Sequence, residues 1–253
     1  MTRIMHILNI AAYKFIALDR LPDMQVAVLN SLQTHNLKGT VLLAEEGINL
    51  FLAGTVAEVH GFLAWLRLDA RLNDLEIKES LSTTQPFRKL LVKIKSEIIR
   101  MNHPTIQPGE ERAPAVDALT LKRWLDTGLD DAGRPVVMLD TRNDFEVDVG
   151  SFKNAIDWRI SKFTEFPQAL LDNSPALMGK TVVSFCTGGI RCEKAAIYMR
   201  EAGVQNVYQL DGGILKYFEV HGPTGEHAHF EGECFVFDER RSLDPNLKPR
   251  IAT

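Results

Sequence analysis

The sequence is poor in cysteine, with only Cys186, Cys192 and Cys234 among 253 residues. A small, odd number of cysteines argues against a secreted disulfide framework and favours a reducing compartment, where a thiol either fills the core or does chemistry. The sequence also lacks an apolar run long enough to cross a bilayer, and its first residues show no signal-peptide cleavage pattern. We therefore expect a cytoplasmic protein without a membrane segment.

An excess of positive charge is also absent. The chain has 29 Lys and Arg against 33 Asp and Glu, so the molecule as a whole has no general attraction for nucleic acid. Binding of RNA would need a local patch, and residues 86–104 contain one candidate. The alternative is the solvent-exposed side of an ordinary strand, where basic residues are common. The candidate residues, which we call the basic segment, are Arg88, Lys89, Lys93, Lys95 and Arg100.

Sequence motifs for binding a cofactor are missing as well. The sequence contains no G-x-G-x-x-G nucleotide loop and no convincing iron-binding triad, so no resident cofactor is expected. His227 and His229 lie near Glu226, Glu231 and Glu233, but this spacing fixes no coordination geometry. Flexible polar segments of this composition are commoner than metal sites, and we predict no metal centre.

The first hundred residues alternate between strand and helix patterns. Thr55 followed three residues later by Glu58 predicts a capping box at the start of a second helix. The resulting order βαββαβ predicts a ferredoxin-like α+β domain at residues 1–100. Strands are expected at residues 4–16, 39–44, 48–53, 75–78 and 90–95, and the first helix at residues 23–35.

The rest of the chain has a different pattern. Residues 101–114 are rich in proline, glycine and charge, which predicts a linker. Within residues 115–222, helices alternate with short apolar strands at residues 136–139 and 181–185. Such strands are typical of a central parallel sheet buried on both faces, so we expect an α/β domain. The remaining residues, 223–253, are polar and predict an irregular tail.

Cys186 directly follows the apolar strand 181–185, at the end of the strand where α/β sheets bind ligands. Residues 191–202 have a helical pattern, so the thiol precedes a helix N-terminus, whose amides and dipole stabilise negative charge. This position lowers a cysteine pKa from about 8.5 towards about 7 or below and supplies a thiolate. The paired glycines let the loop amides point inward. The predicted active-site loop is Cys186, Thr187, Gly188, Gly189, Ile190 and Arg191.

Two residues, Arg191 in the loop and Cys192 directly after it, have alternative interpretations. Arg191 adds a permanent cation that either fixes the loop or meets an anionic substrate. Cys192 either resolves an oxidised Cys186, or accepts its sulfur, or only packs beside the loop. Cys234 lies among acidic and aromatic residues and is expected to pack. A buried, inert Cys186 would not explain why strand end, glycines, arginine and helix start occur together.

Three segments resemble the successive landmarks of a rhodanese domain. They are residues 140–146 (Asp-Thr-Arg-Asn-Asp-Phe-Glu), the loop 186–191, and residues 206–214. Four residues separate Cys186 from Arg191, a spacing that resembles sulfur-handling rhodaneses. The related dual-specificity phosphatases use a loop one residue longer, so the spacing is against phosphate transfer.

More narrowly, the chain resembles the rhodanese-containing tRNA uridine-34 hydroxylases over nearly its whole length. The segments that carry this resemblance are residues 46–49, 95–99, 186–195 and 232–238. The resemblance implies formation of 5-hydroxyuridine at the tRNA wobble position, with molecular oxygen as co-substrate and an unidentified electron donor. Many members continue into a cysteine-rich tail that is absent here, and Leu50 stands where the family often has glycine.

The resemblance also implies roles for particular residues. Cys186 would be the essential nucleophile, and the basic segment would bind tRNA, because phosphate contacts position a nucleic acid. A protein that donates sulfur or electrons is a further candidate partner. Asp140, Arg142 and Glu146 should lie near the thiol and tie down its loop. The residues expected to support Cys186 are thus Asp140, Arg142, Glu146 and Cys192.

Two other functions remain open at this point. One is a sulfurtransferase that carries a Cys186 persulfide from thiosulfate or a desulfurase to an acceptor. The loop length agrees with it equally well, but it does not require the extra N-terminal domain. The other is a catalytically idle RNA-binding protein that has kept the fold, against which the intact loop argues.

Overall fold

The computed structural model describes residues 6–225 and 229–250, which form two compact units. The described part of the first unit runs to Ile99 and includes Phe237–Arg241. The second contains Arg100–Val236 and Ser242–Arg250. No helix among the described residues is long and apolar enough to span a membrane.

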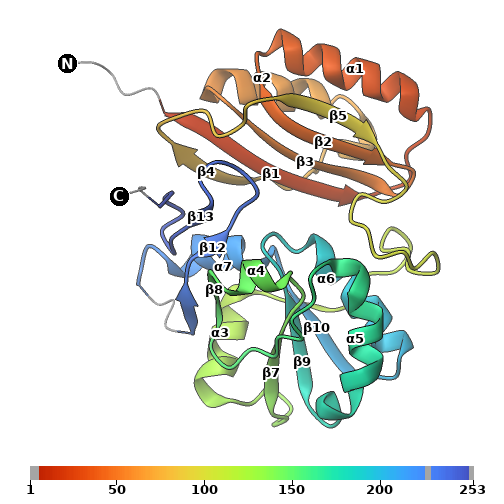
Figure 1. The fold of residues 1–253 in the computed structure, drawn as a ribbon, viewed down its shortest axis with the longest axis vertical. Coiled ribbons are helices and arrows are strands. Elements are labelled where there is room, and N and C mark those ends of the chain that lie inside the picture. The colour runs from red at the N-terminus through yellow and green to blue at the C-terminus, as the bar shows by residue number, and fades with distance from the viewer. Residues whose placement is uncertain (1–5, 226–228, 251–253) are drawn as a thin grey trace. The chain divides into compact units, whose positions relative to one another are not determined.

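The first unit is a five-stranded sheet with two helices on one face (Figure 1). Its strand order β4-β1-β3-β2, with helices after β1 and β3, confirms the predicted ferredoxin-like fold. A fifth strand, β5, pairs in parallel with β2 at the edge. The elements are β1 (Ile7–Phe15), α1 (Leu21–Thr34), β2 (Lys38–Ala44), β3 (Gly47–Gly54), α2 (Val56–Leu66), the 3-10 helix η1 (Ala70–Leu72), β4 (Lys78–Ser82) and β5 (Leu90–Ile94).

The core of this unit lies between the sheet and the two helices. Ile48 and Leu50 of β3 pack with Val28 of α1 and Phe62 of α2, and all four are fully buried. Alternate residues of each strand face this layer, as expected for a sheet covered on one side. The Thr55 capping box is confirmed, because the side chain of Thr55 accepts from the amide of the third helical residue.

One predicted strand of the first unit is displaced. β4 begins at Lys78, whereas the apolar pattern placed this strand at residues 75–78. Leu75 is buried in the core but follows the 3-10 helix η1, before the strand. The apolar pattern therefore placed the strand too early, because Leu75 is buried in a loop and not in the strand.

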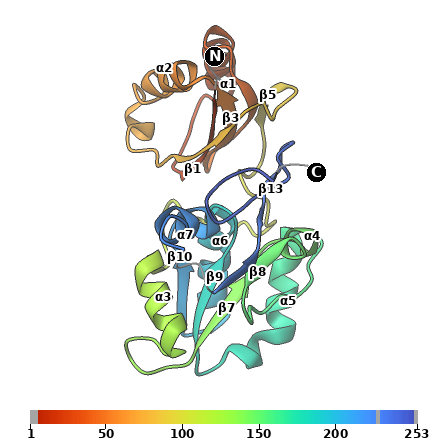
Figure 2. The same ribbon diagram turned by 90° about the vertical axis from the view of Figure 1, so that its left-hand side faces the viewer.

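The second unit is built on a four-stranded parallel sheet of order β6-β10-β9-β7, which confirms the expected α/β class. Figure 2 shows α3 on one side of this sheet and α5 on the other. The central strand β9 is buried over its whole length. The main elements are β6 (Ala115–Val116), α3 (Ala118–Thr127), β7 (Val136–Asp140), α4 (Asp144–Val147), β8 (Gly150–Phe152), α5 (Phe166–Asn173), β9 (Thr181–Phe185), α6 (Ile190–Glu201), β10 (Asn206–Leu210) and α7 (Gly213–His221).

The segment expected to be an irregular tail contains short strands. β11 (Phe230–Gly232) pairs with β8, and β12 (Cys234–Phe235) pairs with β13 (Ser242–Leu243). Phe230 and Cys234 are buried in the core of the second unit. Apolar side chains placed between polar ones thus bring this segment onto the domain.

The residues expected to form a linker, 101–114, contain neither helix nor strand. They are not loosely attached, because Met101, Ile106 and Ala113 are each at most 2% exposed. This segment packs as an ordered part of the second unit.

Candidate active site

Cys186 and Asp140 lie at the carboxyl ends of two neighbouring parallel strands, β9 and β7. In the register of β7 with β9, Asp140 pairs with Phe185, the residue before the cysteine. Thr141 joins the two strand ends, because its amide and its hydroxyl both donate to the carbonyl of Phe185, each at 3.0 Å. The expected proximity of the Asp-Thr-Arg segment to the thiol therefore follows from the strand order.

The loop after Cys186 turns its amides toward the sulfur. The N–H of Gly189 donates to the Cys186 Sγ at 3.1 Å, and α6 begins at the next residue. Gly189 has φ of +100°, a conformation that residues with a Cβ rarely adopt. Only glycine gives this position without strain, and it lets the start of α6 face the thiol.

The surroundings of Cys186 favour a thiolate. Burial raises the pKa of this thiol, because the side chain is only 1% exposed. A hydrogen bond from Cys192, the positive charge of Arg191 and the loop amides outweigh burial and lower the pKa to about 6. At neutral pH, most Cys186 is therefore ionised and nucleophilic.

The start of α7 holds the loop from the outside. The amide of Ile214 donates to the carbonyl of Cys186 and the amide of Leu215 to that of Thr187, both at 3.0 Å. A Cβ on Gly213 would lie 2.4 Å from the Cys186 carbonyl oxygen, so only glycine permits this approach. The end of the segment 206–214, which carried part of the resemblance, thus holds the backbone of the thiol loop.

Two buried ion pairs support the loop. Arg191 donates from both terminal nitrogens to Glu146, at 2.6 and 2.8 Å, and Arg142 makes a bidentate pair with Asp140. Arg142 also donates to the carbonyl of Gly150 at 2.6 Å. Arg191 therefore fixes the loop with its N–H groups, while its charge still acts on the thiolate. Burial raises the pKa of Glu146, but the charge of Arg191 outweighs it and the net pKa is lowered.

The other two cysteines differ in their relation to Cys186. Burial, with the hydrogen bond to Cys186 and its charge, raises the pKa of Cys192 well above 9. The hydroxyl of Thr141 lies 3.7 Å from its sulfur. Cys234 is also fully buried, and burial raises its pKa to about 12, although Arg142 acts in the opposite direction. The sequence did not reveal that Cys234 lies near the buried arginine that supports the loop.

Comparison with known proteins decides the family. A model described as a UPF0176 acylphosphatase-like domain matches residues 7–98, and a rhodanese-like domain model matches residues 120–219. The tRNA uridine(34) hydroxylase of Bordetella petrii is 65% identical over 96% of this chain and 95% of the relative. This chain belongs to the tRNA uridine(34) hydroxylase family. The member from Bordetella pertussis is 63% identical over 96% of this chain and 98% of its own, and that from Variovorax paradoxus 63% over 97% and 92%.

The Glu-Gly-Ile-Asn segment by which the chain resembles the hydroxylase family has a structural use. The carboxylate of Glu46 accepts from the backbone amide of Ile98 at 2.7 Å, and the side-chain Nδ2 of Asn49 donates to the carbonyl of Ile98 at 3.1 Å. Two segments that carried the resemblance, 46–49 and 95–99, therefore hold each other. Leu50, the departure from the family pattern, is fully buried in the core.

The basic segment divides between the two units. Lys89, Lys93 and Lys95 are exposed on or beside the edge strand β5 of the first unit. Arg88 is also exposed but forms an ion pair with Glu239. Arg100 belongs to the second unit, where its guanidinium donates to Asn102 at 2.8 Å.

No group of three His, Cys, Asp or Glu residues that could hold a metal ion occurs among the described residues. His229 instead contacts the carboxylate of Asp126 at 2.6 Å. Glu226 and His227, which completed the histidine cluster in the sequence, lie outside the described residues.

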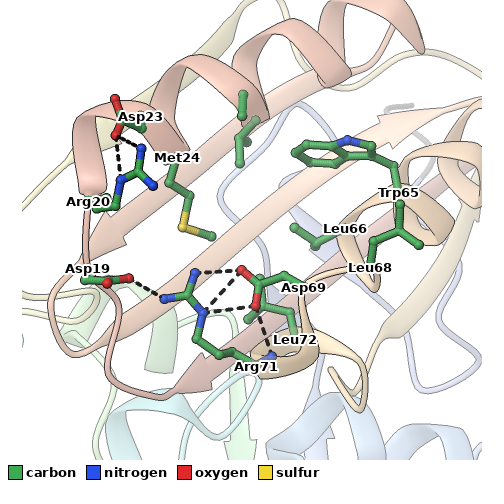
Figure 3. Close-up of a pocket in the computed structure, with 12 residues that line it drawn as sticks. Asp19, Arg20, Asp23, Met24, Trp65, Leu66, Leu68, Asp69, Arg71 and Leu72 are labelled. Carbon is green, nitrogen blue, oxygen red and sulfur yellow. Dashed lines mark hydrogen bonds and ion pairs between the residues drawn. The ribbon is translucent and has the colours of Figure 1, made fainter.

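The first unit also contains a pocket of about 550 Å³ between α1 and α2 (Figure 3). Met24 and Trp65 contribute apolar surface to it. On its rim, Arg71 bridges Asp19 and Asp69 at 2.7 Å each. The charged groups of this pocket are thus satisfied by one another, and its lining contains no part of the thiol loop.

Proposed function

We propose that this protein is a tRNA uridine(34) hydroxylase that converts the wobble uridine to 5-hydroxyuridine, with Cys186 as the nucleophile. The relatives that match nearly the whole chain are named for this activity. The observation that supports the assignment within this chain is the position of Cys186 just before α6, where its sulfur accepts from the Gly189 amide at 3.1 Å. These surroundings lower the pKa of the thiol to about 6 and favour a thiolate at neutral pH.

A thiolate in this position allows the protein to take part in the reaction as a nucleophile. Addition of the Cys186 sulfur to C6 of uracil breaks the C5–C6 double bond and places electron density on C5, which then forms a bond to oxygen. Loss of the C5 proton and of the thiolate restores the double bond and frees the cysteine. Molecular oxygen bonds to C5, and a separate donor, a protein or a small reductant, supplies two electrons. Together with two protons these break the O–O bond, so that one oxygen atom stays on C5 as the hydroxyl and the other leaves as water.

The substrate is bound by charge that is local to the first unit. Lys89, Lys93 and Lys95 are exposed around one edge strand, and in our proposal they contact tRNA phosphates. Contacts of this kind position the nucleic acid but do not read its sequence. A protein that modifies tRNA would act in the cytoplasm.

Analysis of tRNA nucleosides by mass spectrometry tests this proposal. Cells that lack the gene should lose 5-hydroxyuridine and nucleosides derived from it, and the wild-type gene should restore them, whereas Cys186→Ala should not. Loss of thiolated nucleosides would instead identify a sulfurtransferase. Unchanged nucleosides would leave only a binding role and contradict the proposal.

A further inference from the structure

The three free cysteines of this chain are all buried in the second unit, but only two of them interact with each other. Cys192 donates a hydrogen bond to the sulfur of Cys186. Cys234 has a different neighbour, since its thiol lies 3.7 Å from the carbonyl oxygen of Phe235. Cys192 is therefore the cysteine whose thiol interacts with the reactive thiol.

Local structure holds Cys192 in this position. Its amide donates to the carbonyl of Gly189 at 3.0 Å, which fixes it on the first turn of α6, directly after the loop. From the other side, the Thr141 hydroxyl lies 3.7 Å from the Cys192 sulfur. The same hydroxyl donates to the carbonyl of Phe185, so the end of β9, the loop and the start of α6 converge on the two sulfur atoms.

We propose that Cys192 is the resolving thiol of Cys186, and that the two form an intramolecular disulfide when a hydroperoxide oxidises Cys186. This would keep the nucleophile from irreversible oxidation. The inference rests on the reactive thiolate and not on the hydroxylation of tRNA. Its test reads sulfur chemistry directly and is independent of the modified nucleoside.

The chemistry has two balanced steps. In the first, the Cys186 thiolate attacks one oxygen of the hydroperoxide, the O–O bond breaks, and sulfenic acid and an alkoxide or hydroxide form. In the second, the sulfur of Cys192 attacks the sulfenic sulfur. Hydroxide leaves, takes the proton of Cys192 and departs as water, and a disulfide remains. Two electrons have passed from the two thiols to the hydroperoxide.

The surroundings agree with this order of events. A disulfide requires a sulfur–sulfur separation of about 2.05 Å, closer than a hydrogen bond, so the loop must adjust. Gly188 and Gly189 provide backbone freedom between the two cysteines. While Cys186 is a thiolate, Cys192 keeps its proton and acts as a hydrogen-bond donor. Oxidation removes that negative charge and makes Cys186 the electrophile.

Intact-mass and peptide analysis of the purified full-length protein tests the proposal. The protein is treated with hydrogen peroxide and unfolded in denaturant, because Cys234 is buried in the folded protein. Its remaining thiols are then blocked with N-ethylmaleimide, and it is analysed without reduction. Wild type should lose about 2 Da through closure of a disulfide. It should take up one N-ethylmaleimide, yield a peptide that links Cys186 to Cys192, and be restored by dithiothreitol.

Two variants separate the proposal from its alternatives. Cys192→Ser should form no internal disulfide, and its Cys186 should advance to sulfinic acid at peroxide doses that leave wild type reversible. Cys234→Ser, the matched control, should behave as wild type. If Cys192→Ser fails to fold by circular dichroism, Cys192→Ala takes its place. A link from Cys186 to Cys234, or equal overoxidation of wild type and Cys192→Ser, would overturn the proposal.

Discussion

At the scale of single residues, the reactivity of the site depends on the ionisation of Cys186. We predict that alkylation of Cys186 by iodoacetamide rises with pH around a midpoint of about 6 and is nearly constant above neutrality. In the unfolded protein the midpoint should lie near the ordinary value of about 8.5. The measurement is a rate profile with peptide-level detection, with Cys186→Ser as the blank. A folded-state midpoint near 8.5 would contradict the prediction.

The same lowered pKa links Cys186 to stability. A group whose folded pKa lies below its unfolded value stabilises the fold fully above the unfolded value. That stabilisation is lost as the pH falls through the folded value, which is about 6 for Cys186. The difference in free energy of unfolding between wild type and Cys186→Ser should therefore shift in favour of wild type from pH 6 to 9. A difference that is independent of pH would argue against a thiolate.

A second residue-scale prediction concerns the buried pair of Glu146 with Arg191. Glu146→Gln leaves the charge of Arg191 buried without its carboxylate, which should lower the free energy of unfolding by about 3–5 kcal/mol. Urea unfolding followed by fluorescence measures this change. The control is Asp148→Asn, which removes the exposed ion pair to Arg159 and should have little effect. Equal small losses in both variants would contradict the structural role of Glu146.

At the scale of elements, the reactive loop depends on the close approach of α7. Gly213→Ala places a Cβ against the Cys186 carbonyl and should displace the loop, which lowers the alkylation rate of Cys186 at pH 7. Gly203→Ala is a matched control, because Gly203 also has positive φ but has no atom within 4 Å of the added Cβ. Both changes should lower the free energy of unfolding by about 1–3 kcal/mol through backbone strain. Only Gly213→Ala should slow alkylation, and equal rates would contradict the role of α7 in holding the thiol loop.

Elements with strong local sequence patterns could be predicted, whereas contacts between distant segments could not. The strand, loop and helix around Cys186 could be predicted because they follow each other in the chain and have strong local patterns. The contacts of α7 with the loop and of Glu46 with Ile98 join distant segments, and no local pattern indicates them. The same holds for β11, a strand of three residues that forms by pairing with β8.

At the scale of the whole molecule, binding of tRNA must overcome a net charge of −4. Lys93→Glu with Lys95→Glu should weaken tRNA binding, and the slope of affinity against salt should fall by about 1 for each phosphate that the protein no longer neutralises. Alkylation of Cys186 should not change. Lys180→Glu is the control, since Lys180 precedes β9 and lies at the sheet edge opposite the thiol. Equal binding of tRNA by both variants in a filter assay would contradict a role of the basic segment in tRNA binding.

Fragment mapping of a single tRNA shows whether Cys186 is required for hydroxylation of the wobble uridine. A tRNA with uridine at position 34 is isolated from cells that lack the gene and carry either wild type or Cys186→Ser, and its anticodon fragment is analysed by mass spectrometry. We predict an added oxygen at position 34, or a nucleoside derived from it, with wild type only. The same modification in cells with Cys186→Ser, at the wild-type level, would contradict it.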